Sequence, residues 1–73
     1  MTKTLMWEAK AAPGRGPELL AWALAHADPA ADIYRSADGR VVVIDDSGAG
    51  LPDAPGELLA RPPHLWPFER VSR

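Results

Sequence analysis

The stretch Arg40–Asp46, RVVVIDD, decides the fold because its four consecutive apolar residues leave a strand without a polar face. Valine and isoleucine favour strands, and a strand that is apolar on both sides belongs to a sheet that is covered on both faces. A chain of 73 residues has little material for two covering layers. The stretch therefore predicts a central strand and raises the question of what covers the second face of its sheet.

The segments before this stretch predict a strand and then a helix. Thr4–Ala11 alternates with period two, which predicts a strand that places Trp7 on one side. Pro17 suits the first turn of a helix, and Glu18–Ala27, ELLAWALAHA, is composed of strong helix formers. Asp28-Pro29 ends that helix, because the residue before a proline avoids the α region. The predicted buried stripe consists of Leu20, Leu24 and Ala27, with Leu19 and Ala23 beside it.

The remaining segments predict a hairpin, a short helix and a last strand. Asp32–Asp46 is the hairpin, in which Asp38-Gly39 supplies the positive φ of a two-residue turn. Pro55–Ala60 predicts a helix of one or two turns, and Leu65–Val71 predicts the last strand. Because proline cannot donate to a ladder, Pro67 must lie at a bulge or at the edge of the sheet.

The order strand, helix, strand, strand, helix, strand predicts a single α+β domain over residues 1–73. It is the ferredoxin-like βαββαβ arrangement, a four-stranded antiparallel sheet with two helices on one face. The other face of that sheet stays apolar, with Trp66 and Phe68 on one side of the last strand. Monomers rarely expose an apolar patch of several hundred Å². We therefore expect a homodimer that pairs through the open sheet face.

Composition limits the classes of function. The chain has no cysteine, a formal net charge of −2 and no cluster of basic residues, so we expect neither a disulfide nor a nucleic-acid partner. We expect no metal site and no cofactor, because ligand spacing and phosphate-loop motifs are lacking. The start of the chain lacks the apolar core of a signal peptide, and no apolar run could span a membrane. A cytoplasmic protein is the expectation.

Three segments together resemble the antibiotic biosynthesis monooxygenase-like family of dimeric α+β barrels. They are TLMWEAKAAPGRGPELLAWALAHA, DIYRSADGRVVVI and LWPFERV, which span nearly the whole chain. The resemblance implies two ferredoxin-like subunits whose sheets close a barrel, with a cavity between sheet and helices in each. Some members of the family oxidise polycyclic aromatic compounds without metal or flavin, and some degrade haem. The chain contains no asparagine, so it lacks the asparagine-containing residue sets of the active branches.

Two histidines and four aromatic residues are the candidate site residues. His64 and His26 are the candidate general bases; the alternatives are a loop histidine at the strand entrance and a solvated residue at a helix end. The candidate ligand-binding residues are Trp22, Tyr34, Trp66 and Phe68. For Trp22 and Tyr34 the alternative is structural packing. Trp66, Phe68 and Trp7 would instead fill the dimer interface.

Two acidic positions have mainly structural interpretations. Glu8 is expected to pair across the sheet with Lys10 or Arg70. Asp45-Asp46 is expected to take part in turn hydrogen bonds rather than to hold a cation.

Two functions remain open. The first is a small-ligand protein that holds an aromatic molecule between the first helix and the sheet, with or without cofactor-independent oxidation of an aromatic, polyketide-like substrate. The second is a non-catalytic dimeric module that binds a protein partner. The sequence leaves catalysis undecided.

Overall fold

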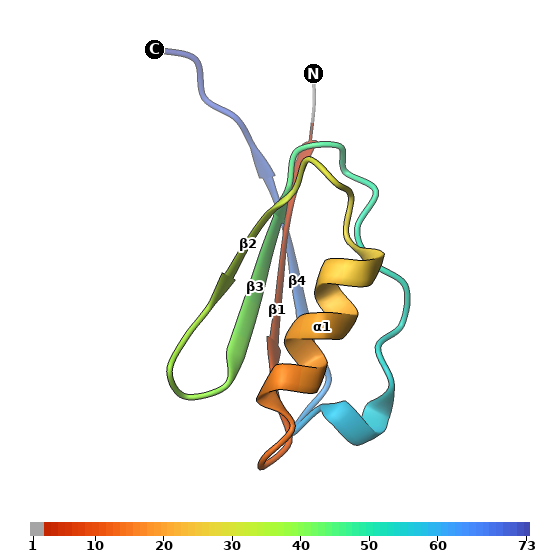
Figure 1. The fold of residues 1–73 in the computed structure, drawn as a ribbon. Helices are drawn as coiled ribbons and strands as arrows, with labels where there is room; N and C mark the ends of the chain where they lie inside the picture. The colour runs from red at the N-terminus through yellow and green to blue at the C-terminus, as the bar shows by residue number, and fades with distance from the viewer. Residues whose placement is uncertain (1–2) are drawn as a thin grey trace.

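The structure, a computed structural model, describes residues 3–73 and has one α-helix on one side of a four-stranded sheet (Figure 1). The elements, in chain order, are β1 (Lys3–Lys10), α1 (Gly16–His26), β2 (Asp32–Arg35), β3 (Arg40–Asp45), the 3₁₀ turn η1 (Gly56–Leu58) and β4 (His64–Glu69). The strand order is β2-β3-β1-β4, and every neighbouring pair is antiparallel. The predicted α+β class and antiparallel four-stranded sheet are confirmed.

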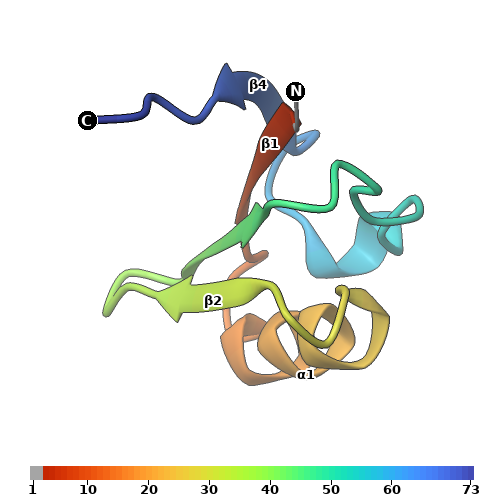
Figure 2. The same cartoon turned by 90° about the horizontal axis from the view of Figure 1, so that it is seen from above.

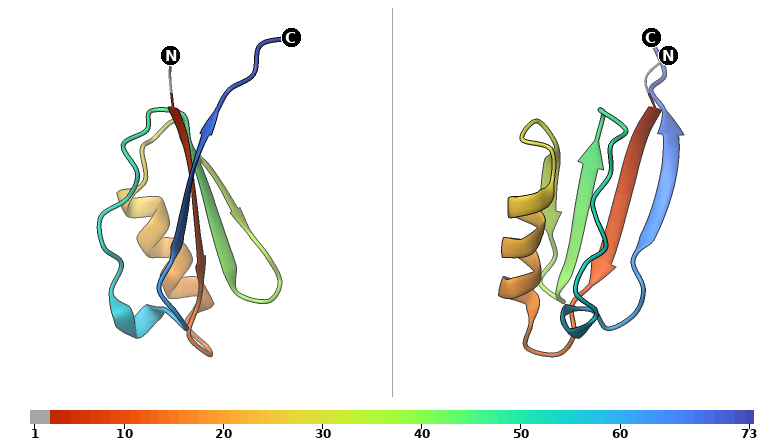
Figure 3. Two further views of the ribbon diagram at one scale, coloured as in Figure 1. Left: turned by 180° about the vertical axis from the view of Figure 1, so that it is seen from behind. Right: turned by 90° about the vertical axis from the view of Figure 1, so that its right-hand side faces the viewer.

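The core lies between α1 and the face of the sheet that α1 covers. Trp7 of β1 is in register with Val43 of β3, and Ala9 with Val41. All four side chains are buried, and Leu19 and Ala23 of α1 meet them from the helix. The backbone of α1 lies nearest to β3 and β2, so the helix covers that half of the face (Figure 3).

Helix α1 begins earlier than predicted, at Gly16, because the amide of Leu19 already donates to the carbonyl of Arg15 at 3.0 Å. Pro17 lies in its first turn, as expected. The predicted buried stripe is wrong in one respect, since Leu24 is 61% exposed. The helix is instead turned so that Leu19 and Ala23 are buried and the larger indole of Trp22 packs beside them. An alanine-rich helix that is apolar on most sides leaves this choice to the packing partner.

The hairpin between β2 and β3 is confirmed, but its turn differs from the prediction. Gly39 has a φ of +88°, and in the described chain positive φ values occur at glycines alone. The amide of Ser36 donates to the carbonyl of Arg40 at 2.9 Å, which closes a three-residue loop at Ala37–Gly39. This is a turn followed by a single left-handed glycine, the next most common hairpin connection after the two-residue turns.

The predicted short helix at Pro55–Ala60 is present only as one turn of 3₁₀ helix at Gly56–Leu58, not as an α-helix. The amide of Leu58 donates to the carbonyl of Pro55, and that of Leu59 to Gly56, both at i to i+3. The backbone then turns to the sheet, where Ala60 donates to the carbonyl of Lys10 at 2.9 Å. Hydrogen bonds to the end of β1 thus replace those that a longer helix would need.

The other face of the sheet, which we call the open face, has no covering element within residues 3–73 (Figure 2). Its side chains alternate with those of the core along each strand. In register across the sheet, Ile44 lies beside Met6 and Met6 beside Trp66. The apolar members of the open face are Met6, Tyr34, Val42, Ile44, Trp66 and Phe68. Strand β4 forms one edge of the sheet, which is the position predicted for a strand that contains Pro67.

Candidate functional site

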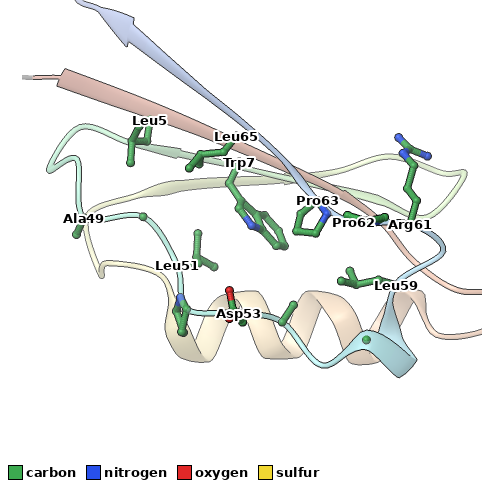
Figure 4. A pocket seen from close by; sticks show the side chains of 14 residues that line it. Leu5, Trp7, Ala49, Leu51, Asp53, Leu59, Arg61, Pro62, Pro63 and Leu65 are labelled. Carbon is green, nitrogen blue, oxygen red and sulfur yellow. The ribbon is translucent and has the colours of Figure 1, made fainter.

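An apolar cavity of about 590 Å³ lies beside α1, in the place where a second helix was predicted (Figure 4). One wall is the covered face of β1 and β4, and the other is the chain between β3 and β4. The volume falls in the range of small-molecule sites. The lining residues are Leu5, Trp7, Ala49, Gly50, Leu51, Pro52, Asp53, Ala54, Gly56, Leu59, Arg61, Pro62, Pro63 and Leu65.

The chain forms the outer wall without a helix because turn hydrogen bonds and prolines fix its course. Asp45, at the end of β3 and 2% exposed, accepts from the amide and the hydroxyl of Ser47 at 2.8 and 2.6 Å. It also accepts from the amide of Gly50 at 3.2 Å. The hydrogen bonds from Ser47, with that from Gly50, hold the pKa of the Asp45 carboxyl below its usual range, against the effect of burial. Turn chemistry at Asp45 is therefore as predicted.

Three polar groups belong to the cavity. The side chain of Trp7 projects from β1 into the space between Leu51 and Pro63 (Figure 4). Asp53 projects toward Trp7 from the opposite wall (Figure 4). Asp53 is exposed and makes no ion pair within the described chain. The guanidinium of Arg61 turns away from the cavity and donates to Glu8 at 3.4 Å. Asp53 is thus the charged group that a ligand would meet first.

A pocket of about 510 Å³ lies between the first turn of α1 and the β2–β3 hairpin, but none of the candidate residues lines it, and the middle of α1 packs closely on the sheet. Leu19, Ala23 and Val43 have no exposed surface there. Trp22 packs against Trp7 with ring centroids 6.0 Å apart, so its interpretation as a packing residue agrees with the structure. None of the candidate residues Trp22, Tyr34, His26, His64, Trp66 and Phe68 lines the cavity beside α1.

The two candidate bases lie on different sides of the sheet. His26, at the end of α1, stacks on Trp22 with ring centroids 4.6 Å apart. Its Nδ1–H donates to the backbone carbonyl of Trp22 at 2.8 Å. His64, at the start of β4, stacks on Trp66 at 5.3 Å on the open face. The structure therefore does not bring His26 and His64 together.

The open face gathers four of the candidates. Tyr34 is on β2, while His64, Trp66 and Phe68 are on β4. Tyr34, Trp66 and Phe68 are about half exposed, at 56%, 40% and 51%. Tyr34, Trp66 and Phe68 therefore lie on the open face, apart from the cavity beside α1. Trp7 does not lie on the open face, since its side chain points to the covered face.

Glu8 lies on the open face, on the inner strand β1, and forms ion pairs with two arginines. Its carboxylate is 3.6 Å from Arg40 and 3.4 Å from Arg61, and its side chain is only 12% exposed. The predicted partners Lys10 and Arg70 are wrong, because Lys10 instead reaches Asp38 at 3.3 Å. The register explains the choice, since Arg40 is at the start of the neighbouring strand β3.

Sequence patterns alone provided little indication of the cavity-lining residues outside the strands. Leu51, Pro52, Pro62 and Pro63 stand in segments that sequence patterns assign to loops. The available signal was the density of proline in LPDAP and RPP, because proline restricts φ and holds a chain extended without helical hydrogen bonds. A rigid extended wall opposite an apolar sheet can leave space that a flexible loop would fill.

In comparisons with known proteins, no family model, no curated protein and no solved structure matches the chain. Among residues 3–73 no helix is long and apolar enough to cross a membrane. No group of three or more histidine, cysteine, aspartate or glutamate residues in the same part of the chain has the arrangement of a metal site.

Proposed function

We propose that this protein is a homodimeric binding protein for a small, largely apolar molecule, built as two ferredoxin-like subunits. The cavity beside α1 carries the proposal. It is of ligand size, its walls are mostly leucine, proline and tryptophan, and the chain that encloses it is fixed by the hydrogen bonds of Asp45. Preformed apolar cavities with few polar groups are typical of small-molecule sites.

The ferredoxin-like assignment rests on the strand order and connections. The order β2-β3-β1-β4 with antiparallel neighbours is the order of the split βαβ arrangement. In this chain the second helix of that arrangement is reduced to η1, and the cavity occupies the space that the helix would fill.

The open face supports the pairing of two subunits. Six apolar side chains from all four strands lie on it, three of them aromatic. Burial of roughly 600 Å² of apolar surface per subunit would contribute on the order of 15 kcal/mol before the costs of association. A small domain supplies only a few kcal/mol by itself, so association would add substantially to its stability.

The charges of the open face favour a second copy as the occupant. Asp32 and Asp46 lie toward one end of the strands. Lys10, Arg40 and Arg61 lie toward the other end, where they outnumber their ion-pair partners Asp38 and Glu8. Two copies related by a two-fold axis perpendicular to the strands would place the acidic end of one sheet on the basic end of the other. Such complementary placement fixes orientation and suppresses other pairings.

Catalysis is not part of the proposal, because neither His26 nor His64 lines the cavity. The protein would bind and hold its ligand rather than transform it. The pairing of subunits through the open face is a separate element, which can be tested without a ligand.

The test uses the whole chain and two measurements. Tryptophan fluorescence and two-dimensional NMR would be followed during titration with small aromatic compounds such as naphthalene derivatives. We expect saturable shifts at Leu5, Leu51 and Leu65, which line the cavity, and none at Tyr34 on the open face. Absence of saturable binding across such compounds would contradict the ligand proposal. A sedimentation experiment that finds only the 7.9 kDa chain would contradict the pairing.

A further inference from the structure

Trp7 carries a polar group that the fold leaves without a partner. Trp7 is only 5% exposed, yet its indole N–H donates no hydrogen bond within residues 3–73. No fully enclosed polar side-chain atom of this part of the chain lacks a partner. The indole N–H must therefore keep contact with open space, and the open space that the ring lines is the cavity beside α1.

A buried indole N–H usually finds an acceptor. Without a ligand, water can accept the hydrogen bond of the indole N–H. An apolar ligand that displaced this water would leave the donor unsatisfied, at a free-energy cost comparable to that of a lost hydrogen bond. A ligand that carries its own acceptor avoids this cost. The position of the N–H thus selects for a molecule with an oxygen acceptor on an apolar body.

The charges around the cavity decide what kind of acceptor fits. Asp53 faces the cavity as a carboxylate without an ion-pair partner in the described chain, so a second carboxylate in the ligand would meet repulsion. Arg61 would offset that repulsion, but its guanidinium is held by Glu8 on the other side of the sheet. The charges around the cavity therefore favour a ligand with an uncharged acceptor over one with an anionic acceptor.

From this geometry we infer that the cavity takes an uncharged, mainly apolar molecule whose carbonyl-type oxygen accepts a hydrogen bond from the indole N–H of Trp7. This inference rests on the proposed function, since it names the ligand class of the same site. It adds Trp7 as the residue that determines specificity and Asp53 as the residue that excludes anions.

Three matched probes test the inference: 2-acetonaphthone, 2-ethylnaphthalene and 2-naphthoate. They share an aromatic body and differ in bearing a neutral acceptor, no acceptor or an anion. We expect the ketone to bind about 3- to 10-fold more tightly than the hydrocarbon, which is the value of one net hydrogen bond. The carboxylate should bind more weakly than the ketone, and Asp53→Asn should reduce that difference.

Two tryptophan variants locate the effect. Trp7→Phe keeps an aromatic ring and removes the N–H, so it should bring ketone and hydrocarbon to equal affinity. Trp22→Phe is the matched control, because Trp22 packs next to Trp7 but does not line the cavity; it should keep the preference for the ketone. If Trp7→Phe fails to fold, as circular dichroism would show, the comparison of ketone with hydrocarbon in the unaltered protein still decides.

The outcomes separate this inference from the proposed function. Equal affinity of the unaltered protein for ketone and hydrocarbon, or tighter binding of the carboxylate, would overturn the inference and leave a binding protein for apolar molecules. A preference for the ketone that survives in Trp7→Phe would overturn the role of Trp7. Failure of all three probes to bind would overturn the proposed function and the inference with it.

Discussion

The two faces of the sheet carry similar apolar side chains, but the chain covers only one of them. Val41 and Val43 of β3 are buried against α1, whereas Val42 and Ile44, which alternate with them, are only partly buried. The same contrast separates Trp7, which is buried, from Met6 beside it in β1. Residue type therefore does not decide which face becomes the core; the position of the covering helix does.

The covered face is itself divided. Around Leu19 and Ala23 of α1 the side chains are fully buried, and beside α1 an extended chain leaves a cavity of ligand size. A second helix in that place would carry its own apolar stripe into the sheet. The 3₁₀ turn at Gly56–Leu58 inserts only Leu58 deeply, so the rest of the space stays open. The shortness of this turn is therefore what leaves room for the cavity.

The largest expected effect concerns the buried and exposed sides of α1. Leu19→Ala removes a side chain with no exposed surface and should lower the free energy of unfolding by about 3 kcal/mol, because a cavity replaces close packing. Leu24→Ala on the same helix is the control, and it should cost less than about 0.5 kcal/mol since Leu24 is exposed. Urea denaturation of both variants measures the difference. Equal losses would mean that α1 is turned differently on the sheet.

The second expected effect concerns the open face. Met6→Lys places a charge at the centre of that face and should weaken dimer formation on the order of 100-fold, because the ammonium would be buried without a partner. The subunit should stay folded, since this face is not its core. Val71→Lys, an exposed apolar residue beyond β4, provides the control and should leave the dimer intact. Analytical ultracentrifugation distinguishes the two variants, and dimer formation unchanged by Met6→Lys would place the interface elsewhere.

The third expected effect concerns the wall of the cavity and depends on pH. The pKa of Asp45 is lowered below its ordinary value of 3.8 in the folded protein, so its carboxylate stabilises the fold above pH 3.8, and the contribution is lost as the pH falls through the lowered pKa. Asp45→Asn should therefore lower stability by about 1–2 kcal/mol near neutral pH, through weaker hydrogen bonds to Ser47 and Gly50. The gap between the two proteins should narrow as the pH falls below 3.8 and through the lowered pKa of Asp45, where Asp45 becomes neutral as well. Denaturation curves from neutral to acidic pH measure it, and a gap independent of pH would contradict the role of the charge.

The smallest expected effect tests whether the charges of the open face are buried in a dimer. Glu8→Gln removes the carboxylate between Arg40 and Arg61 and should cost the isolated subunit less than about 1 kcal/mol, as for other ion pairs near a surface. In a paired sheet the two arginines would lose their counter-charge, so dimer affinity should fall by about tenfold. Glu18→Gln breaks the exposed pair with Arg15 and is the matched control. Sedimentation equilibrium compares the variants, and an unchanged affinity in Glu8→Gln would leave this charge cluster outside the interface.

Much of the local structure could be predicted from the sequence. Strand β1, helix α1 and the β2–β3 hairpin follow from periodicity, from Pro17 and Asp28-Pro29, and from Gly39, all of which act within a few residues. The edge position of β4 follows from Pro67, which removes one backbone donor. These features depend on backbone geometry and hydrogen bonding between near neighbours, so local residues are sufficient to specify them.

The candidate site was predicted less well, because it depends on contacts between distant segments. Structural packing was one interpretation of Trp22, but its partner Trp7 lies fifteen positions earlier in the chain and could not be identified from the helix pattern. The cavity required Ala60 to bond to Lys10 and Asp45 to fix the chain that follows β3. No pattern within either segment reveals the other.

The sequence by itself determined the strands, the single long helix, the apolar character of both sides of β3 and the absence of any disulfide. The tertiary structure decided which side of α1 faces the sheet, the reduction of the second helix to one turn, the partners of Glu8 and the cavity that Trp7 lines. The physical reason is the separation in sequence over which each kind of interaction acts. Periodicity and turn chemistry act between neighbours in the chain, whereas burial, ion pairing and enclosed space arise only when remote segments compete for the same surface.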